Sequence, residues 1–363
     1  MAMVAEINAV HSWICDPRPD DRFGYFGWPT VARLADNTLV AASSGFRDTH
    51  LCPFGKSVLF RSADAGGHWS TGEIINDSPV DDRDTGLVSL PDGSFLLSWF
   101  GSDTRHYWKL LPERFQALLQ NWDDETVLRN IGSFVRHCAA NGRWGVRKRV
   151  PVTAPHGPIL LKTGELLFIG TLFDREDGIP DMSMLDKGIT AVCASSDMGE
   201  TWQRRGTIAT PADHGYFGEP HAIELADGRI LAMIRNDAPD RHFSIWQSIS
   251  SDGGGSWSAP VMISHGAPPH LMRHSSGILI CSVSWREKPY GQRVVFSTDE
   301  GASWSGDWIL RDDGPTADLG YPSTVELADG ALLTVYYQQR LHSNNCGIAV
   351  SRWRLPDEIA PKK

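Results

Sequence analysis

SADAGGHW at residues 62–69 is the first of four copies of one turn, S-x-D-x-G-x-x-W, and the others occupy 195–202, 250–257 and 297–304. In such a turn the Asp accepts backbone hydrogen bonds, the Gly takes a positive φ, and the Trp folds over the adjacent sheet. The octet therefore predicts a hairpin turn with an aromatic lid, and its repetition counts structural units. Residues 139–144 (AANGRW) resemble a fifth copy that is one residue shorter between Gly and Trp.

A second repeat alternates with the first. It consists of Asp-Gly type hairpin turns, each followed by an apolar run, and the turns end at Asn37, Gly93, Gly164, Gly228, Gly277 and Gly330. These positions are 49 to 71 residues apart, a spacing that suits one four-stranded blade with its loops. Six such turns predict an all-β protein, a six-bladed β-propeller. Because no Gly/Ser-rich or charged linker interrupts the repeats, we expect one domain over residues 1–363.

Two segments depart from the repeat. Apolar residues at helical spacing predict a helical insert in blade two, at about 107–136. Blade six has a last strand near 347–355 with no Asp turn after it, so we expect residues 7–15 to supply its outer strand. That exchange between the termini would close the ring and remove an exposed sheet edge.

Composition limits the classes of partner and cofactor. Lys and Arg number 34 against 44 Asp and Glu, a formal net charge of −10, which argues against nucleic acid as a partner. Six scattered cysteines indicate neither a disulfide framework nor a zinc site, and we expect no cofactor and no metal. Because no signal peptide or membrane-length apolar run is visible, we expect a cytoplasmic protein that does not bind membranes, with secretion open if a signal has been removed. Oligomeric state is not indicated.

Aligning the six turns on their last residue predicts where a binding site lies. Nine residues before it, at the start of each innermost strand around the central funnel, stand Trp28, Asp84, Pro155, Glu219, Pro268 and Tyr321. The next strand runs antiparallel and returns to the same face seven to ten residues after the turn. The residues there are Arg47, Asp103, Asp174, Arg235, Arg286 and Arg340. Four guanidinium groups around one funnel predict a ligand that carries a carboxylate.

Each of these residues also has a purely structural interpretation. A single Arg at a strand end is most often solvated or ion-paired, and a Tyr near a strand start is usually a packed aromatic residue. His156, His221 and His270 follow three inner-strand starts and are candidates for substrate contact or for a metal site, although three separate blades need not bring them together. Residues 81–84 (DDRD) are able to pair among themselves.

The chain resembles the sialidase superfamily, in its bacterial branch with Asp-box (BNR) repeats, over essentially all six blades. Residues 219–235 (EPHAIELADGRILAMIR) are similar to the family segment that carries a catalytic Glu and a triad Arg, and residues 320–327 (GYPSTVEL) to the segment that carries the nucleophilic Tyr. Arg286, with Arg293 as the alternative, stands near a further triad Arg. Arg47 and Asp48 stand near the family's blade-one Arg and acid/base Asp. The Asp boxes alone mark the fold only.

One position departs from the family pattern. Sialidases open blade one with Phe/Tyr-Arg-Ile-Pro, whereas this chain has Phe26-Gly27-Trp28-Pro29, with Gly in place of the Arg. Arg47 or Arg340 is able to substitute for it, but a different acidic sugar, or no sialic acid at all, is also open.

The resemblance implies an exo-glycosidase with a Tyr nucleophile, an exception among retaining glycosidases. Tyr321 attacks, Glu219 acts as its base, Asp48 or Asp84 protonates the leaving oxygen, and Arg235, Arg286 and Arg340 hold the carboxylate. The substrate is a terminal sialic acid or related nonulosonic acid on a small glycan. Two alternatives remain: another acidic-carbohydrate enzyme, such as a uronic-acid lyase or hydrolase that uses Tyr321 with one of the three histidines, and a propeller that binds glycans without turnover.

Overall fold

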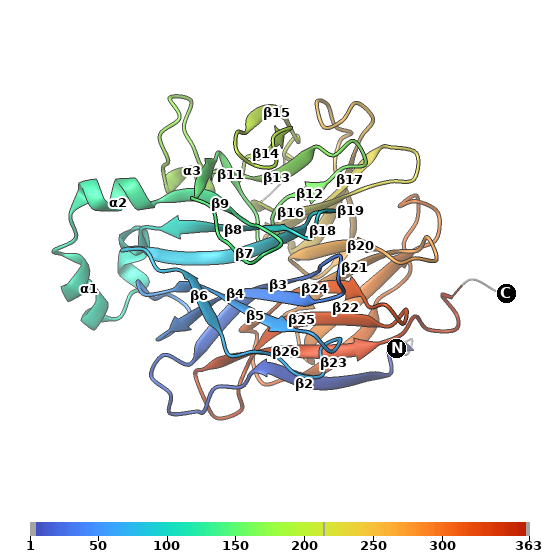
Figure 1. Cartoon of the computed structure of the whole chain (residues 1–363), viewed down its shortest axis with the longest axis horizontal. Coiled ribbons are helices and arrows are strands. Elements are labelled where there is room, and N and C mark those ends of the chain that lie inside the picture. Colours follow the sequence, from blue (N-terminus) through green and yellow to red (C-terminus); the bar gives the residue numbers. More distant parts are fainter. Residues whose placement is uncertain (1–4, 213–214, 361–363) are drawn as a thin grey trace.

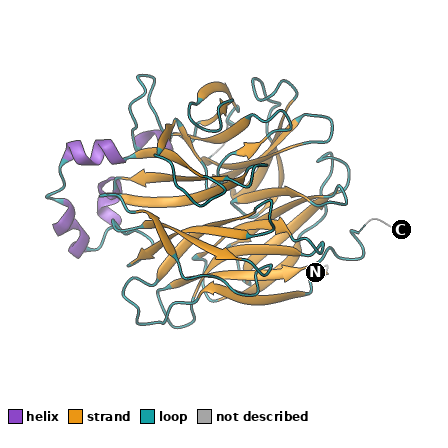
Figure 2. Ribbon diagram, in the orientation of Figure 1, coloured by secondary structure: helices purple, strands orange, loops and turns teal. Residues whose placement is uncertain are grey.

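The structure is a computed structural model that describes residues 5–212 and 215–360. Its strands form six sheets arranged as a six-bladed β-propeller, which confirms the predicted fold (Figure 1). Strands account for nearly all of the regular structure, and the helices gather at one side of the ring (Figure 2).

The blades follow one another along the chain, and each runs from its inner to its outer strand. Blade one contains β3 (Tyr25–Arg33), β4 (Leu39–Arg47), β5 (Lys56–Ser62) and β6 (Glu73–Asn76). Blade two contains β7 (Asp81–Ser89), β8 (Phe95–Ser102), β9 (Gly132–Cys138) and β10 (Lys148–Val150). Blade three contains β11 (Val152–Thr153), β12 (Ile159–Leu160), β13 (Leu166–Leu172), β14 (Thr190–Ser195) and β15 (Gln203–Thr207).

The second half of the ring repeats this plan. Blade four contains β16 (Tyr216–Glu224), β17 (Ile230–Ala238), β18 (Arg241–Ser250) and β19 (Val261–His265). Blade five contains β20 (Pro269–Arg273), β21 (Leu279–Trp285), β22 (Tyr290–Ser297) and β23 (Trp308–Gly314), and the short β1 (Ala5–Glu6) pairs parallel with β23. Blade six contains β24 (Leu319–Glu326), β25 (Leu332–Gln339), β26 (Cys346–Trp353) and β2 (Ala9–Cys15).

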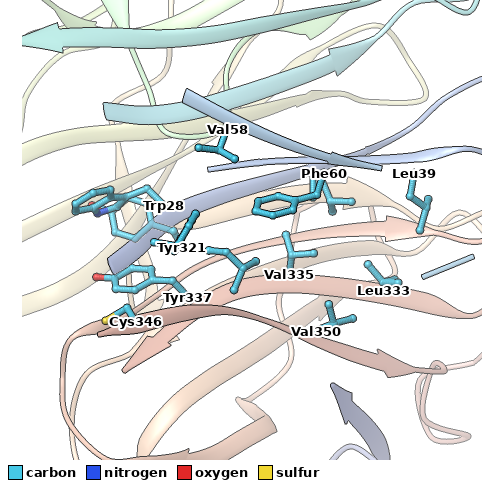
Figure 3. Packing of buried hydrophobic residues seen from close by; sticks show 14 of the residues in the cluster. Trp28, Leu39, Val58, Phe60, Tyr321, Leu333, Val335, Tyr337, Cys346 and Val350 are labelled. Atoms are coloured by element: carbon cyan, nitrogen blue, oxygen red, sulfur yellow. The ribbon is translucent and has the colours of Figure 1, made fainter. Parts of the chain in front are cut away.

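The hydrophobic core is divided among the contacts between neighbouring blades. Each of six apolar clusters joins residues of two adjacent blades, including the pair of blades six and one that closes the ring. In that closing cluster Phe60 of blade one and Leu333 of blade six are buried, and Trp28, Tyr321 and Tyr337 form its aromatic end (Figure 3). Removing this apolar surface from water is the main force that holds the ring together.

Each Asp box packs its own blade against the blade before it. In the box of blade five, Asp299 accepts hydrogen bonds from the Ser297 hydroxyl and the Ser303 backbone N–H, at 2.8 and 2.9 Å. The box Gly, Gly301, has φ +81°, and a Cβ built on it would lie 2.3 Å from Leu231 of blade four. Trp304 packs against the cluster between blades four and five. The Trp of every other box, Trp144 of the shortened copy included, likewise packs at the contact with the preceding blade.

The two ends of the chain meet in blade six. Strand β2 pairs antiparallel with β26, from Ala9 opposite Trp353 to Cys15 opposite Ile348, with a bulge near Cys15. The N-terminal strand is therefore the outer strand of the last blade, and it satisfies the backbone groups of β26 that would otherwise form an open edge.

The insert in blade two is shorter than the predicted 107–136, and it is not a single helix. It consists of η1 (Thr104–Leu110), α1 (Glu113–Leu119) and α2 (Asp124–Asn130). Residues from 132 onward belong to strand β9, which the sequence pattern missed because its apolar residues continue the helical spacing. Phe115 and Leu119 are buried, whereas Leu110 and Leu118 are exposed. A fourth short helix, α3 (Ser183–Asp186), follows β13.

Two further properties concern the described residues as a whole. None of their helices is long and apolar enough to cross a membrane. All six cysteines have free thiols.

Candidate active site

Four inner strands carry the same backbone irregularity at the same place. Trp28, Asp84, Glu219 and Tyr321 have φ between +48° and +53°, and the pairing of each inner strand with its neighbour shifts register there. Positive φ in a non-glycine residue costs free energy, and a bulge re-aims the side chain it carries. Four blades therefore turn one side chain each toward a common cavity at the end of the funnel.

Tyr321 and Glu219 meet across this cavity. The Tyr321 hydroxyl donates a hydrogen bond to Glu219 Oε1 at 2.6 Å, and Arg235 donates to Glu219 Oε2 at 2.7 Å. Tyr321 is 4% exposed, and its burial is the main reason that its pKa lies well above the usual value. The negative charge of Glu219 raises this pKa further, whereas the positive charges of Arg235 and Arg286 lower it. The resting pair is therefore a neutral phenol donating to a carboxylate that is able to take its proton.

Three arginines line the cavity. Arg235 lies on β17 and is held by Asp237, whose Oδ2 is 2.9 Å from its Nε. Arg286 follows β21, and its buried Nε and Nη2 have no hydrogen-bond partner among the residues that the structure describes. Arg83 precedes Asp84 on β7, and its guanidinium lies 4.3 Å from the centre of the Trp28 ring. Arg286 is thus a cation with unused donors beside Tyr321, whose ring centre is 5.7 Å from its guanidinium carbon.

Asp84 is a buried carboxyl on the floor of the cavity. It is 8% exposed, and within the described part of the chain its Oδ1 has no hydrogen-bond partner. Burial raises the pKa of Asp84 to about 7, with the attraction of Arg83 opposing the shift and the charge of Glu219 adding to it. Near neutral pH a large fraction of Asp84 is therefore protonated and able to donate a hydrogen bond.

The cavity has a volume of about 420 Å³ and mixed walls. Trp28 and Tyr216 supply aromatic surface, and His50 contributes an imidazole from the loop between β4 and β5. Tyr107 of η1 and Asp186 of α3 also reach it, so the insert in blade two helps to shape the site of its own chain. This volume lies within the usual range of small-molecule sites.

Comparison with known proteins agrees with this architecture. A family model described as a BNR repeat-like domain matches residues 156–335. No curated protein matches the chain significantly. Among solved structures, a protein of unknown function from Dyadobacter fermentans is 21% identical, with a TM-score of 0.76 over 96% of this chain and 99% of that one. The NanB sialidase from Streptococcus pneumoniae is 13% identical, with a TM-score of 0.66 over 96% and 71%.

A further solved structure shows the same likeness. Trypanosoma rangeli sialidase is 14% identical, with a TM-score of 0.63 over 95% of this chain and 59% of that one. The fold of this chain is a six-bladed β-propeller similar to those of the two sialidases. At these identities the likeness concerns the fold, and the chemistry of the site has to be argued from this chain's own residues.

Arg235 and Arg286 reach the cavity, but Arg47 and Arg340 are not among its lining residues. Arg47 is fully buried behind Trp28 and forms two hydrogen bonds with Asp81, at 2.5 and 2.8 Å. Arg340 pairs with Asp16 at 2.8 Å and lies over Trp13 of β2. The difference follows from strand alternation: Arg235 and Arg286 stand an odd number of residues after their turns, whereas Arg47 and Arg340 stand an even number after theirs.

The remaining candidates also separate. Asp84 and Trp28 line the cavity, whereas Asp48 lies outside its lining and forms an ion pair with Arg114 of α1. Arg293, the alternative to Arg286, is 4% exposed and donates to the Arg311 carbonyl, also outside the lining.

The three histidines do converge, but on one another and outside the lining of the cavity. The rings of His221 and His270 stack at 4.4 Å, and His156 lies edge-on to both, at 5.7 and 4.9 Å. His221 Nδ1 accepts the Leu271 N–H at 2.9 Å, which places the proton of a neutral ring on Nε2 and leaves no lone pair there for a metal. No group of three or more acidic, His or Cys side chains able to hold a metal occurs among the described residues.

Sequence reasoning missed three groups in this region: Arg83, Asp237, and His50 with its partner Asp318. Arg83 stands one residue before Asp84, just as Gly27 stands one residue before Trp28. Aligning blades one and two at these positions would have identified Arg83 as the counterpart of Gly27. Asp237 is two residues beyond Arg235 on β17. Because side chains alternate along a strand, the sequence alone could have predicted that the two residues share a face. His50 lies in a loop, and no periodic pattern predicts its direction.

Proposed function

We propose that this protein is an exo-glycosidase of the sialidase type that releases a terminal acidic sugar, a sialic acid or a related nonulosonic acid. The observation that carries the proposal is the hydrogen-bonded pair of Tyr321 and Glu219 in a cavity that also contains Arg83, Arg235 and Arg286. Neither a packed core tyrosine nor a solvated arginine accounts for this combination.

The pair suits attack on a carbon that bears a carboxylate. An ionised nucleophile would be repelled by that charge, whereas a neutral phenol approaches without repulsion and transfers its proton to Glu219 as the new bond forms. Arg235 stabilises Glu219 as a carboxylate before the transfer. Water then hydrolyses the bond between Tyr321 and the sugar, and the proton returns from Glu219 to the phenolate oxygen.

The arginines supply the binding site for the substrate carboxylate. Arg286 has unused donors, and Arg235 is positioned by Asp237, so the two present N–H groups beside Tyr321. Arg83, from blade two, is our candidate for the third cation. Its guanidinium lies over Trp28 of blade one, next to Gly27, which replaces the Arg of the sialidase pattern. Charge-assisted hydrogen bonds of this kind contribute about 1.5–3 kcal/mol each.

Asp84 has a role on the sugar side of the cavity. It belongs to the buried floor beside Arg83, and Glu219 contributes to raising its pKa. A carboxyl group that keeps its proton near pH 7 donates a hydrogen bond to a sugar hydroxyl or to the substrate carboxylate, which an ionised Asp would repel.

A hydrolysis screen tests the proposal. Aryl glycosides of N-acetylneuraminic acid, Kdn, Kdo and glucuronic acid are incubated with the wild-type protein and with Tyr321→Phe, Arg286→Ala and Arg340→Ala. We expect release from a nonulosonic acid substrate and a loss on the order of 10³-fold or more in Tyr321→Phe. Arg286→Ala should lower kcat/KM by about 10- to 100-fold, the equivalent of one charge-assisted bond. Arg340→Ala, a matched arginine outside the cavity, should leave it unchanged.

Three outcomes would contradict the proposal. Turnover that is unaffected in Tyr321→Phe would remove the nucleophile. A product that absorbs in the ultraviolet would indicate elimination and favour a lyase. Saturable binding of the same glycosides without any product would favour a glycan-binding propeller.

A further inference from the structure

A second proton-transfer unit lies on the wall of the same cavity. The His50 Nδ1 is 3.1 Å from Asp318 Oδ1 and 2.9 Å from the Tyr25 hydroxyl oxygen. Asp318 immediately precedes β24, so the unit joins the loop after β4 of blade one to blade six. None of the groups assigned above to the nucleophile or to the carboxylate site belongs to it.

The hydrogen bonds of Asp318 fix which nitrogen of His50 faces the ligand. The hydroxyls of Tyr25 and Tyr337 both donate to Asp318, at 3.0 and 3.1 Å, so the carboxylate is an acceptor. Burial alone would raise the pKa of Asp318, but the hydrogen bonds from His50 and the two tyrosines hold it below its usual value. His50 therefore carries its proton on Nδ1, and Nε2 has no hydrogen-bond partner among the described residues.

The imidazole is held in place from the other sides as well. Its ring lies edge-on to Trp28 at 5.0 Å, and Arg47 Nη2 donates to the His50 carbonyl at 2.9 Å. This contact gives the buried Arg47 a function in the site, because it anchors the loop that presents His50. Because His50 lines the cavity and its Nδ1 is engaged by Asp318 and Tyr25, Nε2 is the nitrogen that remains available to a ligand.

His50 and Asp84 occupy different levels of the cavity. His50 is half-buried, whereas Asp84 and Tyr321 are buried. The sugar has to sit on Tyr321 at the floor, and the departing alcohol has to leave toward solvent. A group that protonates the alcohol, and then exchanges its proton with water, belongs at the solvent side.

We propose that His50, oriented by Asp318, is the general acid and base of the reaction, a role that rests on the function proposed above. In the first step Nε2–H gives its proton to the glycosidic oxygen as the bond between that oxygen and the sugar carbon breaks, and the alcohol departs. In the second step the neutral Nε2 takes a proton from the water that attacks the sugar carbon, and the bond to Tyr321 breaks. The two steps together consume one water and return His50 to its starting charge.

The surroundings of His50 set the direction of the pH dependence. Asp318 favours its charged form, whereas burial and the cations Arg83 and Arg47 favour the neutral form, and burial is the largest of these effects, so the pKa lies below its usual value. Tyr25 is the other titratable group in contact. Because the first step needs protonated His50, turnover of substrates with a poor leaving group falls as pH rises through this pKa.

The test compares leaving groups. The nonulosonic acid identified by the screen is presented as its 4-nitrophenyl glycoside, whose leaving group departs without protonation, and as its methyl glycoside, whose leaving group does not. The variants are His50→Asn, Asp318→Asn, Asp84→Asn and Tyr321→Phe. In His50→Asn we expect kcat/KM for the methyl glycoside to fall by about 10²- to 10⁴-fold, the usual contribution of a general acid, with a far smaller change for the nitrophenyl glycoside.

Two further readouts separate proton transfer from a structural role. His50→Asn should lose the decline of methyl glycoside turnover at high pH, and Asp318→Asn, which keeps the shape of the side chain, should show the same leaving-group pattern more weakly. The assignment would be overturned if His50→Asn lowered kcat/KM equally for both glycosides. It would also be overturned if Asp84→Asn, rather than His50→Asn, lowered kcat/KM selectively for the methyl glycoside.

The two proposals fail in different ways. If Tyr321→Phe loses hydrolysis of both glycosides but His50→Asn affects the two glycosides equally, the sialidase-type function stands and the role of His50 is rejected. Turnover of neither glycoside by the wild-type protein would reject the function and the role of His50 with it.

Discussion

At the scale of single residues, the site depends on side chains held in unfavourable environments. Trp28, Asp84, Glu219 and Tyr321 share a left-handed backbone conformation, and Asp84 also loses most of its hydration. Such costs persist only where the surrounding structure imposes them, which is typical of functional sites.

Replacing Asp84 should therefore stabilise the protein in a pH-dependent way. The pKa of Asp84 is about 7 when folded against a reference value of 3.8, so the folded state keeps a proton that the unfolded state loses as pH rises through this window. Stability contributed by the protonated carboxyl is thus present at low pH and lost progressively toward pH 7. Between pH 5 and pH 8 the advantage of Asp84→Asn over the wild type should grow by up to ~3 kcal/mol.

Urea unfolding at the two pH values measures this difference. Asp20→Asn, at an exposed aspartate, controls for the change in net charge. An advantage that stays constant or shrinks with rising pH would mean that Asp84 is already ionised at pH 5.

The residue scale also shows what the sequence could predict of the site. Glu219 and Tyr321 were identified from the repeat, because equivalent strands place equivalent residues on one ring. The positions seven to ten residues after each turn include Arg235 and Arg286, which line the cavity, but also Arg47 and Arg340, which do not. This spacing takes no account of which face of the strand each residue occupies. The directions of bulges and loops depend on contacts between blades, so Arg83 and His50 were missed.

At the scale of elements, each Asp box is a hairpin turn that also fits against the preceding blade. The hydrogen bonds within the turn were readable from the sequence, because Ser, Asp and Gly recur at fixed spacing. Its docking was not, because the partner lies in another blade about 70 residues earlier, as Leu231 does for Gly301. The boundaries of the insert in blade two were also wrong, because Val135 and its neighbours in β9 continue the apolar spacing of the helices.

Two glycines in blade five separate the docking of the box from its turn geometry. Gly301 and Gly277 both have positive φ, +81° and +93°, so Ala at either position costs about 1–2 kcal/mol for the left-handed backbone. A Cβ at Gly301 would also lie 2.3 Å from Leu231, whereas a Cβ at Gly277 meets no described atom within 4 Å. We expect Gly301→Ala to lower the free energy of unfolding by at least ~1 kcal/mol more than Gly277→Ala. Equal losses in urea unfolding would mean that the box does not hold the neighbouring blade.

At the scale of the whole molecule, ring closure is what assembles the site. Tyr321 and Asp318 come from blade six and His50 from blade one, and these blades meet where β2 completes the sheet of β26. The sequence predicted six blades and a strand exchange because the repeats cover the chain and the last blade lacks an outer strand. It could not predict the cavity itself, whose walls come from all six blades, the insert and α3.

The central claim is that Tyr321 forms a covalent bond with an acidic sugar, and trapping that bond tests it most directly. The protein is incubated with 3-fluoro glycosyl fluorides of N-acetylneuraminic acid, Kdn and Kdo, in which the ring fluorine slows hydrolysis of the intermediate, and is then digested and analysed by mass spectrometry. We predict one added fluorosugar on the peptide that contains Tyr321, and none in Tyr321→Phe. Labelling of another residue, or no label from reagents that are nevertheless hydrolysed, would contradict the account.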